Sequence, residues 1–77
     1  MNDPPRVTLY TRKGCHLCDD AKQVLRDAGL TIEEVDIDQD PELQARYNDE
    51  VPVVFLNGRK AFKYRVDPTE LCRRLMR

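Results

Sequence analysis

The fold is decided near the start of the chain, by the stretch Val7-Thr8-Leu9-Tyr10-Thr11-Arg12-Lys13-Gly14-Cys15-His16-Leu17-Cys18. Val7–Thr11 is β-branched, apolar and aromatic, which predicts a strand, and the Arg12-Lys13-Gly14 turn ends it. From Cys15 onward, apolar residues recur at helical spacing as far as Ala28, and Gly29 is suited to end the helix because glycine accepts a left-handed backbone. The pattern therefore places two cysteines where the loop after a strand becomes a helix.

Shorter patterns follow this first strand and helix. They predict a strand over Leu30–Ile37, a helix from Pro41 to about Tyr47, a strand over Val53–Leu56, a strand at about Lys60–Tyr64 and a last helix from Pro68 to Met76. Both later helices begin with an Asp N-cap followed by proline, a residue favoured in the first turn of a helix. Asn57-Gly58 is a strong hairpin signal between the last two strands.

This order, β-α-β-α-β-β-α, predicts an α/β fold. The first strand, helix and second strand should form a right-handed parallel crossover, whereas the hairpin must add an antiparallel pair. A mixed four-stranded sheet flanked by three helices buries all of these elements. We expect a single domain over residues 1–77, with residues 1–6 as a flexible polar N-terminus.

Composition narrows the class of function. The chain has 13 basic and 14 acidic residues and a net charge of −1, and the two signs are interspersed, which argues against nucleic-acid binding. No apolar run is long enough to cross a membrane, and the N-terminus lacks an apolar signal core. We therefore expect a cytoplasmic monomer. Because structural disulfides are rare in the cytosol, a close pair of cysteines indicates redox or metal chemistry.

The chemistry is expected at Cys15 and Cys18. Cys15 falls at a helix start, where unpaired backbone N–H groups stabilise a thiolate, and Arg12 and Lys13 add positive charge. Cys15 is thus the predicted nucleophile, and Cys18, one turn into the helix, is the predicted resolving cysteine. Asp19 and Asp20 oppose a nearby thiolate, so we expect only a moderate depression of the Cys15 pKa.

His16 lies between the two cysteines, where it is either an exposed residue of the turn or a group that tunes the thiolates and the proton of the leaving group. The third cysteine, Cys72, is expected to be a small buried hydrophobic residue of the last helix. Neither residue favours a metal site, because His16 is poorly placed to complete a tetrahedral set and no second Cys-x-x-Cys is present.

The chain resembles the glutaredoxins, within the wider thioredoxin-fold family. The resemblance rests on Val7–Cys18, on Val51-Pro52 and on Phe55-Leu56-Asn57-Gly58. It implies a thioredoxin/glutaredoxin-like fold and a thiol–disulfide oxidoreductase with no tightly bound cofactor. It further implies a cis peptide bond between Val51 and Pro52, beside the cysteines, with the Val51 backbone available to hydrogen-bond a substrate.

The resemblance also suggests partners. Arg12 occupies the position of a lysine common in glutaredoxins, and so resembles a cation near the substrate carboxylate or thiolate. The family's Gly-Gly and acidic residues after the hairpin, which approach glutathione, are replaced by Phe62–Asp67, where Asp67 alone echoes the acidic part. The implied substrates are disulfide-containing proteins or glutathione mixed disulfides, with glutathione as a candidate co-substrate. The implied external reductant is glutathione or thioredoxin reductase.

Two other classes of function remain as alternatives. One is a metal- or iron–sulfur-binding module that uses Cys15 and Cys18 together with a partner chain or glutathione. The other is a non-catalytic interaction domain of the thioredoxin fold, with a docking surface around Pro52 and Val53–Leu56.

Overall fold

The computed structural model of the protein describes residues 5–75. Its elements are β1 (Val7–Thr11), α1 (His16–Asp27), β2 (Ile32–Asp36), the short 3-10 helix η1 (Ile37–Gln39), α2 (Pro41–Tyr47), β3 (Val53–Leu56), β4 (Arg59–Lys63) and α3 (Pro68–Leu75). The predicted order of strands and α-helices is confirmed. The expectations for residues 1–4 and Met76 lie outside the described residues.

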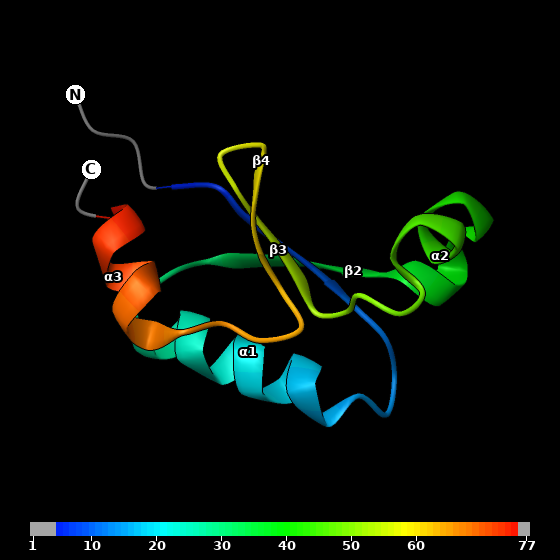
Figure 1. The fold of residues 1–77 in the computed structure, drawn as a ribbon, viewed down its shortest axis with the longest axis horizontal. Coiled ribbons are helices and arrows are strands. Elements are labelled where there is room, and N and C mark those ends of the chain that lie inside the picture. Colours follow the sequence, from blue (N-terminus) through cyan, green and yellow to red (C-terminus); the bar gives the residue numbers. More distant parts are fainter. Residues whose placement is uncertain (1–4, 76–77) are drawn as a thin grey trace.

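The four strands form one mixed sheet in the order β2-β1-β3-β4 (Figure 1). β1 and β2 are parallel, as the crossover through α1 predicts, whereas β1 pairs with β3, and β3 with β4, in antiparallel fashion. The Asn57-Gly58 turn closes the predicted hairpin, with both residues at positive φ, as a tight hairpin turn of this kind requires. Arg6 is joined to this turn, because its backbone N–H and C=O both hydrogen-bond Asn57.

One face of the sheet packs against α1 and α3 and forms the main core. Its buried residues come from β1, β3, α1, α3 and the segment before α3: Val7, Leu9, Ala21, Leu25, Val54, Val66 and Leu71. Figure 1 shows α1 and α3 close together, with α2 at the far end of the sheet. Since neighbouring strand residues point to opposite faces, Tyr10 lies on the other face, where it stacks on Tyr47 of α2 at 4.9 Å between ring centroids.

The second strand is shorter than predicted. Leu30 belongs to the end of α1, because its N–H donates to the Leu25 carbonyl while the N–H of Gly29 donates to the Arg26 carbonyl. These two bonds form a Schellman cap, with Gly29 at a φ of 79°. At the other end, the Asp36 carboxylate accepts the N–H of Asp38 and starts η1, so Ile37 leaves the strand.

The last strand lies within one residue of the prediction at each end: it covers Arg59–Lys63, against about Lys60–Tyr64, and it ends where Tyr64 turns into the left-handed region at a φ of 70°. The prediction for Cys72 is wrong. Cys72 is exposed and not part of the core. Leu71 is buried in its place, and residues one position apart on a helix point in directions about 100° apart.

Candidate active site

The sheet register brings the predicted site residues to one end of the molecule. Thr11, the last residue of β1, pairs with Asp36 of β2, and Tyr10 pairs with Val53 of β3. Val53 in turn pairs with Lys63, the last residue of β4. Four parts of the chain therefore meet at the same end of the sheet: the loop that carries Cys15, the start of η1, Pro52 and Tyr64. This end of the sheet holds the carboxyl ends of the parallel strands, a common position for functional sites in α/β folds.

Cys15 is the N-cap of α1. Its backbone is extended, with φ −95° and ψ 108°, and its Sγ accepts the backbone N–H of Cys18 at 3.3 Å. The Cys15 carbonyl accepts the N–H of Asp19, the first regular bond of the helix. The Cys15 sulfur thus lies at the positive end of the helix, as the sequence predicts, and the side chain is half-buried.

Cys18 has a different environment, with only 1% of its surface exposed. Burial raises the pKa of the Cys18 thiol above its ordinary value, and so does its hydrogen bond with Cys15; hydrogen bonds with the Thr11 side chain and the Arg12 backbone offset this rise in part. Burial thus favours the neutral thiol of Cys18, whereas Cys15 is only half-buried. The two cysteines therefore differ in burial and in environment.

The Val51–Pro52 peptide bond is cis, as the resemblance implied. Pro52 is buried, and its carbonyl accepts the N–H of Tyr64 at 2.9 Å, while the Glu50 carbonyl accepts the same N–H at 3.2 Å. These bonds fix the loop that enters β3 and hold Tyr64 at its positive φ. The Tyr64 side chain remains 45% exposed.

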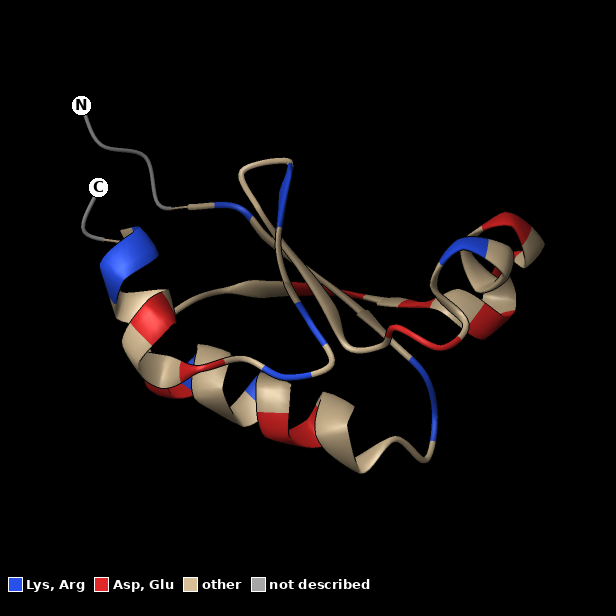
Figure 2. Cartoon of the chain, in the orientation of Figure 1, with Lys and Arg blue, Asp and Glu red and all other residues tan. Residues whose placement is uncertain are grey.

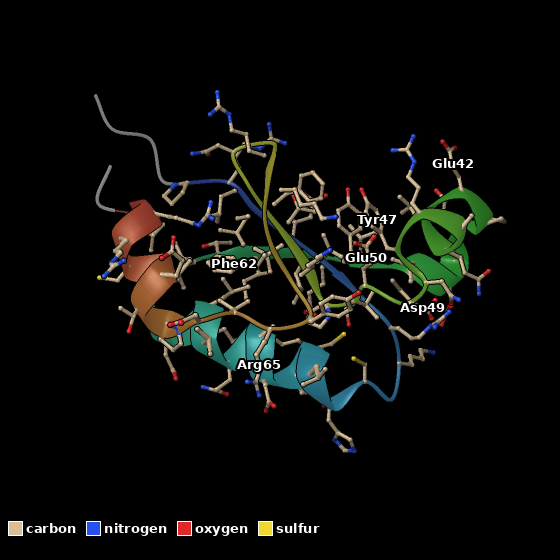
Figure 3. All side chains as sticks on the ribbon, in the orientation of Figure 1. Glu42, Tyr47, Asp49, Glu50, Phe62 and Arg65 are labelled. Carbon is tan, nitrogen blue, oxygen red and sulfur yellow. The ribbon has the colours of Figure 1, made fainter. Side chains whose placement is uncertain are left out.

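Glu50, on the loop that enters β3, lies between two lysines of β4. Its carboxylate is 3.2 Å from Lys60 and 3.6 Å from Lys63. The hydrogen bond from Lys60 is the main reason that the pKa of Glu50 lies below its ordinary value. Figure 3 shows Asp49 and Glu50 together on this loop. The loop is thus tied to β4 by side chains as well as by the backbone.

Arg12 does not point freely into the site. Its Nε donates to both carboxylate oxygens of Asp38 at 3.1 Å, its Nη2 donates to Oδ1 at 2.8 Å, and its Nη1 donates to the Asn48 carbonyl at 3.3 Å. Gln44 donates a further hydrogen bond to Asp38. We call these four residues the Arg12 clamp. It joins the loop before Cys15 to η1, α2 and the loop that leads to Pro52.

The electrostatics of the clamp follow from these bonds. The hydrogen bond from Arg12 lowers the pKa of Asp38 below its ordinary value, and the same bond raises the pKa of Arg12. No sequence pattern pointed to Asp38, which is 26 positions from Arg12. Two other residues predicted to tune the cysteines, Lys13 and His16, are exposed beside Cys15.

A groove lies on the other side of the cysteines, between α1 and the segment that joins β4 to α3. Its volume is about 420 Å³, and we call it the Leu17 groove; its lining residues are Leu17, Asp20, Ala21, Val24, Arg65, Val66, Asp67 and Pro68. Leu17, between the two cysteines, is 41% exposed. Figure 3 shows Arg65 beside α1. Sequence analysis missed the groove and Leu17, whose apolar character resembles that of a core residue.

Asp67 caps α3 in addition to lining the Leu17 groove. Its carboxylate accepts the backbone N–H groups of Thr69 at 2.8 Å and Glu70 at 3.4 Å, as an N-cap of α3 should. The predicted cap is therefore confirmed, and the predicted contact of Asp67 with a substrate stays a prediction.

Within residues 5–75, no helix is both long enough and apolar enough to span a membrane. No group of three or more His, Cys, Asp and Glu side chains is gathered there in a way that suits a metal ion.

The sheet order, the helix that begins at a Cys-x-x-Cys pair and the cis-proline at the start of β3 together define the thioredoxin-like class of α/β proteins. The chain belongs to the glutaredoxin-like domain family (DUF836), whose model matches residues 6–76. The resemblance inferred from the sequence is thereby confirmed.

Three comparisons support this assignment. A glutaredoxin-like protein of Dictyostelium discoideum is 33% identical over 75 residues, which is 84% of this chain and 69% of the relative. A solved structure from X. campestris shares 36% identity at a TM-score of 0.79 and covers 91% of this chain and 95% of its own. NrdH-redoxin of Escherichia coli, a glutaredoxin-like protein, shares 29% identity at a TM-score of 0.68 and covers 88% of this chain and 92% of its own.

Proposed function

We propose that the protein is a cytoplasmic thiol–disulfide oxidoreductase that reduces or exchanges disulfides through Cys15 and Cys18. The observation that carries this proposal is the contrast between the two cysteines: Cys15 is half-buried at the N-cap of α1, whereas Cys18 is buried. The backbone N–H of Cys18 donates a hydrogen bond to the Cys15 sulfur. A metal-binding pair has no need of such a difference between nucleophile and resolving group.

The reaction has two exchange steps. The Cys15 thiolate attacks one sulfur of a substrate disulfide, the substrate S–S bond breaks, and the other substrate sulfur leaves as a thiolate that takes up a proton. Cys18 then loses its proton and attacks the Cys15 sulfur, which releases the second substrate thiolate. A pair of electrons has passed to the substrate, and glutathione or thioredoxin reductase reduces the new Cys15–Cys18 disulfide.

Several residues support these steps. The helix N-terminus favours the negative sulfur of Cys15, and Lys13 and His16 lie beside it as tuning residues. The Val51 backbone, next to Pro52, is available for hydrogen bonds to an extended substrate segment. NrdH-redoxin has a thioredoxin-like activity profile, and a protein disulfide is accordingly our preferred substrate class for this chain.

The test compares single-cysteine variants in the reduction of a protein disulfide such as insulin. Two arms supply the electrons: glutathione with its reductase, and thioredoxin reductase with NADPH. Cys15→Ser should reduce turnover to the uncatalysed rate, and Cys18→Ser should accumulate a mixed disulfide that mass spectrometry detects. Cys72→Ser is the matched control and should retain full activity. Activity that survives in Cys15→Ser would show that the assignment is wrong.

A further inference from the structure

The Arg12 clamp suggests how the site chooses between small anionic thiols and protein substrates. Arg12 is three positions before the nucleophile, on the loop that leads to it. A guanidinium at this distance from a reactive sulfur would ordinarily attract a substrate carboxylate, because it offers a planar pair of donors. In this chain those donors already face a carboxylate of the protein itself.

The pairing is extensive. Three of the hydrogen bonds from Arg12 end on Asp38, and the fourth ends on the Asn48 carbonyl. The side chains of the pair are partly shielded, with 29% and 38% of their surfaces exposed. Gln44 holds the Asp38 carboxylate from α2, and the Asp36 carboxylate holds its backbone N–H. Asp38 is therefore fixed from both sides before any substrate arrives.

The surrounding charge has the same effect. Asp36 and Asp49 also act on Arg12 electrostatically, so three carboxylates contribute to the raised pKa of its guanidinium. Asp19 and Asp20 add negative charge to the first turns of α1, and Figure 2 shows these acidic segments on both sides of the basic loop before the cysteines. An arriving anion thus meets a guanidinium whose charge is already paired with Asp38.

We propose that Asp38 is a positioning residue for substrate choice: by holding Arg12, it prevents the guanidinium from binding the carboxylate of a small anionic thiol such as glutathione. The site then favours protein disulfides whose neighbouring residues are neutral or cationic. This inference deepens the proposed function and rests on it.

The test uses binding, so that it does not depend on turnover. The probe is S-methylglutathione, a non-reactive molecule that carries more carboxylates than ammonium groups, and its Kd is measured by NMR titration of the reduced protein. Asp38→Asn should bind the probe about five- to tenfold more tightly, the size expected for one released charge-assisted hydrogen bond. Asp38→Glu keeps the carboxylate and should bind like the unaltered protein.

Two controls separate the clamp from simple charge. Asp49→Asn also removes a carboxylate near Arg12, yet it frees no hydrogen bond and should change the Kd by less than about twofold. The double variant with Asp38→Asn and Arg12→Gln should lose the gain, because the guanidinium is absent. A gain that persists in the double variant, or a Kd unaltered in a folded Asp38→Asn protein, would overturn the proposal.

A second variant keeps the proposal testable if Asp38→Asn does not fold. Arg12→Gln alone should change the Kd for S-methylglutathione by less than about twofold, because the guanidinium is already engaged. A tenfold loss of affinity would mean that Arg12 binds the probe directly, and the proposal would then be wrong. A protein that reduces no disulfide but binds the probe as described here would refute the proposed function and with it the role of Asp38 in substrate choice, whereas the hold of Asp38 on Arg12 would stand.

Discussion

The two flanks of the cysteine pair are built in opposite ways. On the Arg12 clamp, charged groups of the protein satisfy one another before a substrate arrives. On the Leu17 groove, apolar surface stays open to solvent, and Leu17 is one of the two exposed large hydrophobic side chains of residues 5–75; the other is Tyr64, whose N–H binds the carbonyl of Pro52. Leu17 and Tyr64 are thus exposed apolar residues near the cysteine pair, and we expect a protein substrate to contact them.

A small fold can thus favour some partners over others without a deep pocket. The clamped flank gives rigidity, because its bonds connect the loop before Cys15 to η1 and α2. The groove flank favours binding of a partner, because burial of Leu17 in the complex removes apolar surface from water. The cysteines lie between them, so each flank can be altered without direct change to the reacting sulfurs.

The largest expected effect concerns the sulfurs themselves. In the reduced protein at about pH 7.5, iodoacetamide should alkylate Cys15 at least tenfold faster than Cys18, because Cys18 is buried and burial raises its thiol pKa. Peptide-resolved mass spectrometry over time measures both rates, and Cys72 serves as an exposed internal reference. Equal rates at the two sites would remove the division of labour on which the comparison depends.

A charge in the groove should have the next largest effect. Leu17→Asp places a carboxylate on the open apolar surface and should raise the KM for a protein disulfide about fivefold. The fold should tolerate the change, because an acidic residue suits the first turn of a helix. Gln23→Asp, on an exposed part of α1, is the matched control. The same increase in KM for both variants would show that the groove is not a binding surface.

Two variants of Asp67 separate its effect on stability from its effect on substrate binding. Asp67→Ala removes the N-cap of α3 and should lower the free energy of unfolding by about 1 kcal/mol in urea denaturation. Asp67→Ser restores a capping oxygen and should recover most of that loss. If the serine variant regains stability but not affinity for a protein disulfide, Asp67 also contacts substrate; recovery of both assigns it to the cap alone.

Much of this site was accessible from the sequence, because its signals are local. The Cys15 N-cap, the Gly29 helix end, the Asp67 cap and the Asn57-Gly58 hairpin each depend on residues within one or two turns of one another. The resemblance to glutaredoxins supplied the cis bond before Pro52, which no local pattern would have revealed.

The features that sequence analysis missed are long-range. Asp38 meets Arg12 only after β1 and β2 have paired, and the pair Thr11–Asp36 is what brings η1 beside the loop. Cys72 was misplaced because the inward face of α3 is chosen by its packing on the core, where Leu71 takes the buried position. Leu17 was missed because exposure is a property of the assembled surface.

The smallest effect is the pH dependence of the Arg12 clamp. The pKa of Asp38 is lowered in the folded protein by its hydrogen bond from Arg12, so the folded state favours the carboxylate more than the unfolded chain does. The resulting stabilisation is present above the ordinary Asp pKa and is lost as pH falls through the lower folded value. The difference in thermal midpoint between the unaltered protein and Asp38→Asn should therefore shrink as pH falls from about 6 to about 3.

Glu42→Gln, which alters an exposed ion pair of α2, is the control and should show little such dependence, since its partner Arg46 is also largely exposed. A difference between the unaltered protein and Asp38→Asn that stays constant over this range would mean that the bond to Arg12 contributes nothing to the fold, and that the clamp flank is no more rigid than the groove.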